Sequence, residues 1–141
     1  MIHKREVGGH LLGFRDEDSF YISRAVAYWT PLSGRTWWGP NWDSFKRRGR
    51  QLETTRLRWI GVYHSHVEVK GTASTLQSGG DKKTHKFSTR PLEIIVRVTN
   101  YPKKWPEMCL SYEKYGYYFD ICGYVKDPRE KIKRIKVVEA R

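Results

Sequence analysis

The stretch Arg58-Trp59-Ile60-Gly61-Val62-Tyr63-His64-Ser65-His66 combines a strong strand pattern with two histidines at its end. Four of its first six residues are β-branched or aromatic, which is typical of a buried strand. Side chains two positions apart lie on the same side of an extended chain, so we expect His64 and His66 to face the same way. The end of one strand can therefore present both imidazoles to a single ion.

Further strand patterns occur on both sides of this stretch. A short apolar run at residues 6–14 and a second at 20–26 predict a hairpin, since a polar turn separates them. Later strands are expected at residues 92–98, 108–112, 117–125 and 132–138. Asp43 or Ser44 is expected to cap a helix that runs through Phe45 and Leu52 and, in its longest form, Leu57. The pattern predicts an α+β fold of one domain, residues 1–141, with a mixed, mostly antiparallel sheet and one or two helices.

The bulk composition indicates a folded chain without a membrane span. Hydrophobic residues make up 38% of the chain and aromatic residues 14%, and no run of about 18 apolar residues occurs. No apolar segment follows the basic N-terminus, which predicts a cytoplasmic location. Cys109 and Cys122 match no CxxC metal pattern, so we expect two reduced packing residues rather than a disulfide.

The chain is strongly basic. Its formal net charge is +12, with 27 Lys and Arg residues, and the basic residues gather at 46–50, 82–83 and 129–136. Such a charge attracts polyanions or an acidic protein face in a salt-dependent way. A solvated, lysine-rich surface is the alternative interpretation.

A carboxylate downstream of the two histidines completes a possible metal-ligand set. Ser78-Gly79-Gly80-Asp81 supplies this carboxylate as Asp81. Three protein ligands leave a fourth tetrahedral position for water, which indicates a catalytic rather than a structural zinc site. Such a site needs a separate glutamate to take the proton from that water, and Glu6 lies upstream. A pair of histidines alone is a weak signal, and the combination strengthens it.

In this combination the chain resembles the JAMM (MPN+ or JAB) metalloprotease family, and most closely its prokaryotic and phage-type JAB branch. The matching segments, in order, are Glu6-Val7-Gly8-Gly9-His10-Leu11-Leu12-Gly13, then His64-Ser65-His66, then Ser78-Gly79-Gly80-Asp81. The resemblance implies the cytidine-deaminase-like JAB/MPN fold, a mixed sheet flanked by helices. Only five residues precede Glu6, so the family's N-terminal helix is expected to be missing.

The resemblance also implies a function. His64, His66 and Asp81 would bind one Zn²⁺ per chain, Glu6 would act as general base, and Ser78 would stabilise the oxyanion. The family hydrolyses isopeptide or peptide bonds next to ubiquitin-like or sulfur-carrier proteins with a Gly-Gly tail. Trp37 and Trp38, in the loop at residues 29–42, are expected to contact this protein substrate.

Two questions stay open. Eleven residues separate His66 from Ser78, whereas the family usually has seven, and a spacing of seven would place Gln77 in the slot of the third ligand. We favour Asp81, because glutamine is a poor zinc ligand. The alternative functions are a catalytically inactive JAB-like scaffold and a basic nucleic-acid-binding domain, in which aromatic and basic residues together contact single strands.

Overall fold

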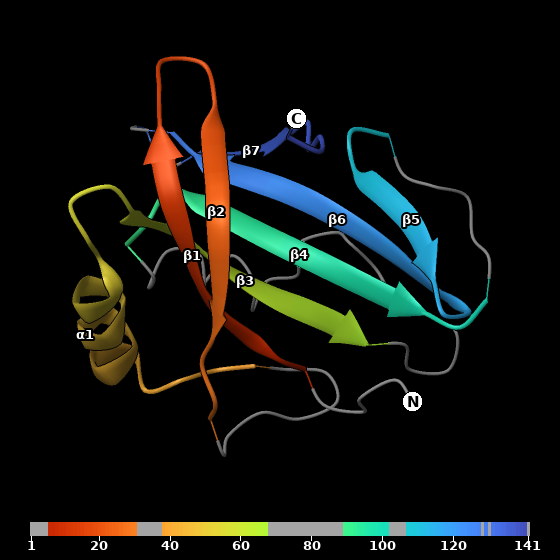
Figure 1. Ribbon diagram of the computed structural model, residues 1–141, viewed down its shortest axis with the longest axis horizontal. Coiled ribbons are helices and arrows are strands. Elements are labelled where there is room, and N and C mark those ends of the chain that lie inside the picture. Colours follow the sequence, from red (N-terminus) through yellow and green to blue (C-terminus); the bar gives the residue numbers. More distant parts are fainter. Residues whose placement is uncertain are drawn as a thin grey trace.

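The computed structural model describes residues 6–30, 38–67, 89–101, 107–127, 129 and 131–140. Its strands are β1 (Gly8–Arg15), β2 (Phe20–Ala27), β3 (Arg58–Val67), β4 (Leu92–Thr99), β5 (Leu110–Lys114), β6 (Tyr117–Lys126) and β7 (Ile132–Ile135). The helix α1 (Trp42–Leu52) lies between β2 and β3 in the chain. All seven strands belong to one sheet in the order β2-β1-β3-β4-β6-β5, and β7 pairs with β6 (Figure 1).

The expected α+β JAB/MPN fold, with a sheet flanked by one or two helices, is wrong. The described residues are mostly β, with α1 as their helix, and the sheet curls into a half-barrel (Figure 1). The physical reason is that the curled sheet covers much of its own apolar surface. On the side away from α1, Ile135 and Val137 from the C-terminal part of the chain pack against the buried residues of β1, β3 and β4.

The curl begins in β1, which carries an irregularity against each of its neighbours. The register shifts between Leu11 and Leu12 toward β3, and between Leu12 and Gly13 toward β2. Such bulges bend a strand and increase its twist. The only parallel pair among the described strands is β3 with β4, so the sheet is mixed.

Helix α1 packs on one side of the sheet, against β1 and β3 (Figure 1). Its N-cap is Asn41, two to three residues before the predicted caps, and Asn41 accepts a hydrogen bond from the Ser44 backbone N–H at 3.1 Å. Phe45 is fully buried beneath the helix. Gly49 faces the Trp59 indole so closely that no Cβ would fit between them, which brings the helix axis close to β3. None of the described helical residues form a segment long and apolar enough to cross a membrane.

The apolar core has two layers, one on each side of the sheet. The layer beneath α1 contains buried Leu12, Trp38, Phe45, Trp59 and Val62. The layer on the opposite side contains buried Leu11, Ile60, Leu92 and Ile94. Leu11 and Leu12 thus face opposite sides, as neighbours in a strand do.

The prediction of two reduced cysteines is also wrong. Cys109 and Cys122 form a disulfide. Cys109 immediately precedes β5, and the β5–β6 register places Leu110 opposite Ile121, so the two cysteines are cross-strand neighbours. Their spacing in the sequence did not indicate this, because the pairing depends on the turn between the two strands.

Candidate metal site at the end of strand β3

The two histidines of β3 lie next to each other at the end of that strand. Their Nε2 atoms are 3.2 Å apart, within hydrogen-bond distance, and their ring centroids are 5.0 Å apart. The His64 side chain is buried, whereas His66 is half-buried. The expected strand at residues 58–63 is therefore confirmed and extends further, so that both imidazoles stand on the side of the sheet that carries α1.

Glu6 lies in the segment just before β1, which runs antiparallel to the end of β3. Gly8 pairs with His64, and the Ser65 N–H donates to the Val7 carbonyl at 2.8 Å. Continuing this antiparallel register by one residue places Glu6 opposite His66. Residues that are opposite in antiparallel strands project to the same side of the sheet. The Glu6 side chain therefore projects to the side of the two imidazoles, and the residue is buried, with 6% of it exposed.

A second contact holds the segment of Glu6 against β3. The Val7 backbone N–H donates to the Ser65 hydroxyl at 3.0 Å, on the side of the sheet opposite the imidazoles. Ser65 is buried, and its side chain faces away from the two imidazoles. It therefore fixes the position of the upstream carboxylate through the backbone.

Trp38 forms a wall of the site. Its indole is parallel to the His64 imidazole, with ring centroids 6.5 Å apart, and it lies over Gly8, where an added Cβ would be 2.6 Å from the indole. Trp38 is buried and packs with Phe45 in the core, so its described position is that of a packing residue beside the site. Its expected contact with substrate stays a prediction.

The other expected site residues lie outside the described residues: Trp37, Gln77, Ser78 and Asp81. Within the described part of the chain, no cluster of three His, Cys, Asp or Glu side chains is arranged to hold a metal ion. The structure thus brings His64 and His66 together and places Glu6 opposite His66 in the extended strand register. The choice between Asp81 and Gln77 stays untested.

A row of polar residues continues from His66 across the sheet. Arg97 of β4 pairs with His66 in the parallel register, so both side chains project to the same side. The Arg97 guanidinium forms a buried ion pair with Asp120 of β6, and the Ser111 hydroxyl of β5 donates to the same carboxylate at 2.5 Å. Sequence reasoning missed this row. The signal was Arg97, which with Glu93 is one of two charged residues in the otherwise apolar stretch of residues 92–98.

His10 is a third imidazole on this side of the sheet, further from the strand end. Its Nε2–H donates to the Phe45 carbonyl at 2.7 Å, and its ring stacks on the Phe45 ring with centroids 3.8 Å apart. Burial lowers the pKa of His10 below its ordinary value, and the positive charge of Arg48 lowers it further. His10 therefore joins α1 to β1 as a neutral packing residue.

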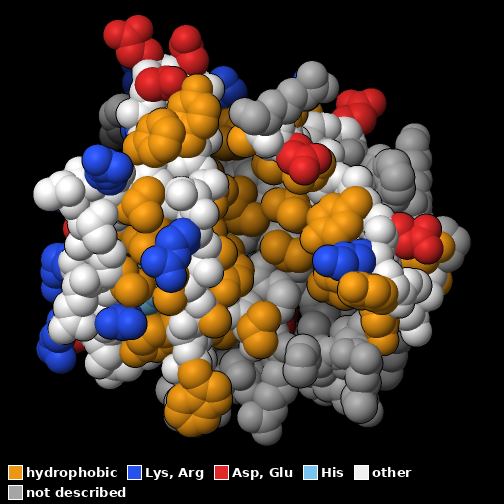
Figure 2. All heavy atoms as spheres, in the orientation of Figure 1, with side chains coloured by type: hydrophobic (Ala, Val, Ile, Leu, Met, Phe, Trp, Pro, Cys, Tyr) orange, Lys and Arg blue, Asp and Glu red, His pale blue; other side chains and the backbone are white. Residues whose placement is uncertain are grey.

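Charged side chains are unevenly distributed over the surface. Acidic side chains gather at the tip of the β1–β2 hairpin, apolar side chains lie across the hollowed middle of the face shown, and Lys and Arg gather on the side where α1 lies (Figure 2). Arg47, Arg48 and Arg50 of α1 are exposed, and its buried residues are Phe45 and Gly49. The helix thus presents a cationic side to its surroundings.

Comparisons of the chain with models of protein families and with curated proteins find no match. The resemblance to the JAMM family therefore depends on the motif residues alone.

Proposed function

We propose that the chain is a zinc-dependent hydrolase that cuts an isopeptide or peptide bond. The observation that carries the proposal is the separation of 3.2 Å between the Nε2 atoms of His64 and His66. Two imidazoles on one tetrahedral zinc, with Zn–N bonds of about 2.0–2.1 Å, have their nitrogens about 3.3 Å apart. The pair thus fits one ion without rearrangement of β3.

The donor set also fits zinc chemically. Imidazole nitrogen is a preferred zinc ligand, and a carboxylate completes many catalytic sites. In this proposal Asp81 supplies that carboxylate, and one Zn²⁺ is held per chain. When bound, zinc would polarise the scissile carbonyl and make water acidic enough to attack it near neutral pH.

Residues of the chain transfer the proton, stabilise the oxyanion and exclude solvent. Glu6, which the extended β1–β3 register places opposite His66, accepts the proton of the attacking water and passes it to the leaving amine. Ser78 donates a hydrogen bond to the developing oxyanion. Trp38, stacked beside His64 and packed on the core, excludes solvent from one side of the imidazole pair.

The substrate class follows from the resemblance to the JAMM family. We propose the zinc-dependent reaction of that family for this chain, although the chain does not have the family's fold. It is a ubiquitin-like or sulfur-carrier protein with an extended Gly-Gly tail, and Trp37 and Trp38 belong to the segment that contacts it. A cytoplasmic location fits such a partner. The Cys109–Cys122 disulfide is evidence against a cytoplasmic location, since disulfides persist mainly in oxidising compartments.

A second candidate function is binding of nucleic acid or another polyanion without catalysis. The observation in its favour is the exposed row Arg47, Arg48 and Arg50 on α1. This function predicts affinity that falls steeply with salt and does not change when a chelator is added. It is compatible with an inactive scaffold in which the histidine pair holds no metal.

The test compares Glu6→Gln with wild type in zinc content and in hydrolysis. The probe is a ubiquitin-like protein whose C-terminal Gly-Gly carries a fluorogenic amide. Loss of the general base should lower turnover by about 100- to 10,000-fold, while the zinc content stays at the wild-type level. Glu17→Gln, at the exposed hairpin tip, is the matched control and should keep full activity. Wild-type turnover that survives complete chelation would contradict the proposal.

The third ligand is assigned by two further variants. Asp81→Ala should lose zinc, whereas Gln77→Ala should retain it. Equal retention in both variants would remove Asp81 from the ligand set.

A further inference from the structure

The Cys109–Cys122 disulfide lies beside a guanidinium group. Arg134 Nη2 is 2.7 Å from Cys109 Sγ and 3.3 Å from Cys122 Sγ. In the described part of the chain no carboxylate pairs with Arg134, so its positive charge acts on the two sulfurs. A neighbouring cation lowers the pKa of a cysteine thiol, because it stabilises the thiolate. The sulfur that departs from this disulfide is therefore a better leaving group than in an ordinary one.

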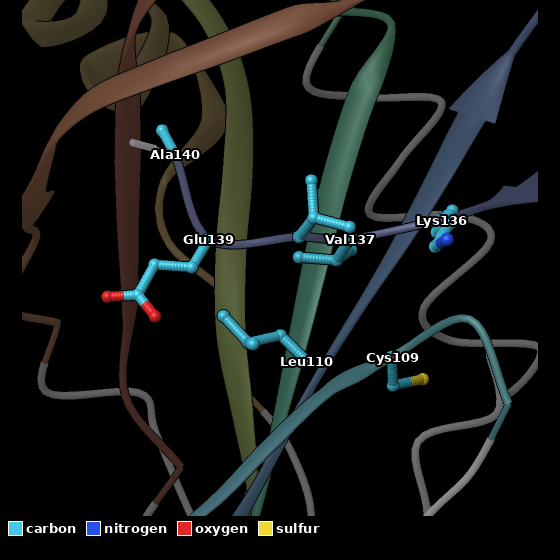
Figure 3. A pocket seen from close by; sticks show the side chains of 7 residues that line it. Cys109, Leu110, Lys136, Val137, Glu139 and Ala140 are labelled. Carbon is cyan, nitrogen blue, oxygen red and sulfur yellow. The ribbon is translucent and has the colours of Figure 1, made fainter.

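The two sulfurs differ in access. Cys122 is fully buried, with 0% of the residue exposed, whereas Cys109 is partly exposed. Cys109 also lines an open cleft of about 600 Å³ between the start of β5 and the C-terminal residues 136–140 (Figure 3). Lys136 and Glu139 line the same cleft with opposite charges, so the access of a reagent depends on exposure rather than on the charge of the cleft. Since Cys109 is the more exposed of the two, a reagent from solvent reaches it before Cys122.

The backbone next to Cys109 is strained. Met108 has φ = 67°, in the left-handed region that non-glycine residues rarely adopt. Its carbonyl accepts a hydrogen bond from the Val137 N–H at 2.8 Å, and Val137 packs against the apolar layer of β1, β3 and β4. Strained conformations persist only where the surroundings hold them. Opening the disulfide would remove one of the constraints on Met108.

From these observations we propose that Cys109 is a thiol–disulfide exchange site for small thiols. An incoming thiolate forms a bond to Cys109 Sγ, the bond between Cys109 and Cys122 breaks, and its electron pair goes to Cys122 Sγ beside Arg134. With a dithiol, the second thiolate of the reagent attacks the mixed disulfide and releases the Cys109 thiolate. The protein disulfide is then reduced to two thiols and the dithiol is oxidised to a cyclic disulfide. This proposal does not depend on the zinc site.

The first experiment maps the attacked sulfur in the wild-type 141-residue chain. The native protein reacts with reduced glutathione, exchange is stopped with an alkylating reagent, and peptides are identified by mass spectrometry. Glutathione should be found on Cys109 and the alkyl group on Cys122. Glutathione on Cys122, an equal distribution, or no reaction under native conditions would overturn the proposal.

The second experiment measures the rate of reduction by dithiothreitol. Arg134→Gln should slow reduction by about threefold or more, since the leaving thiolate loses its cation. Lys133→Gln removes one exposed charge from the same strand and should keep the wild-type rate. Equal rates in the two variants would refute the role of Arg134. If Arg134→Gln does not fold, the mapping in the wild-type chain decides the question.

Discussion

Replacing Gly8 with alanine should destabilise the fold and displace Trp38 from His64. An alanine Cβ at this position would lie 2.6 Å from the Trp38 indole and 2.6 Å from the Tyr63 carbonyl oxygen. The carbonyl belongs to the backbone of β3, which is paired on both sides, so it cannot retreat. Trp38 is therefore the group that must move.

The size of the effect follows from the cost of overpacking. Forcing one extra carbon into a packed core typically costs about 1–3 kcal/mol. In a chain of this length 1 kcal/mol shifts Tm by about 3–4 °C, so the expected drop in Tm is about 3–12 °C. Gly39→Ala is the matched control, because an added Cβ at Gly39 meets nothing within 4 Å. Its Tm should stay within about 1 °C of wild type.

Thermal unfolding followed by circular dichroism in the presence of a chelator measures this effect without any contribution from bound metal. Tryptophan fluorescence should shift in Gly8→Ala, since a buried indole moves, and should not shift in Gly39→Ala. If Gly8→Ala unfolds at the same temperature as Gly39→Ala and its emission spectrum is unchanged, the interpretation that Trp38 packs closely against Gly8 beside His64 is refuted.

Two further perturbations test the buried polar groups. Burial, aided by the charge of Arg48, lowers the pKa of His10 below its ordinary 6.5, so the unfolded chain binds the proton more tightly. The associated stability is fully present above pH 6.5 and is lost as pH falls toward the lowered pKa of the folded state, so urea unfolding should show a weaker pH dependence in His10→Gln. Asp120→Asn leaves the buried Arg97 charge uncompensated and should cost about 3–5 kcal/mol in chemical denaturation. Glu53→Gln weakens an ion pair whose arginine is largely exposed and should cost about 0–1 kcal/mol, and equal costs in the two variants would contradict the burial argument.

Local patterns in the sequence predicted individual elements well. The β-branched and aromatic residues before His64 predicted β3, and alternation along a strand predicted that His64 and His66 share a side of the sheet. The apolar runs around the polar turn at residues 16–19 predicted the β1–β2 hairpin. These predictions succeeded because each depends on neighbouring residues only.

Features that depend on pairing between distant strands could not be predicted in the same way. The position of Glu6 opposite His66 depends on the β1–β3 register. This register shifts between Leu11 and Leu12, and no turn or spacing in the sequence indicates the shift. The disulfide and the row from Arg97 to Asp120 likewise depend on the β4–β6–β5 registers. The fold class was wrong because the curl of the sheet, rather than a second helix, covers the apolar side away from α1.

The zinc content of the purified chain tests most directly whether His64 and His66 bind a metal ion. Elemental analysis of wild type should give about one zinc per chain, which a chelator removes, and the double variant His64→Ala/His66→Ala should give none above background. A wild-type zinc content no higher than that of the double variant would contradict the metal site.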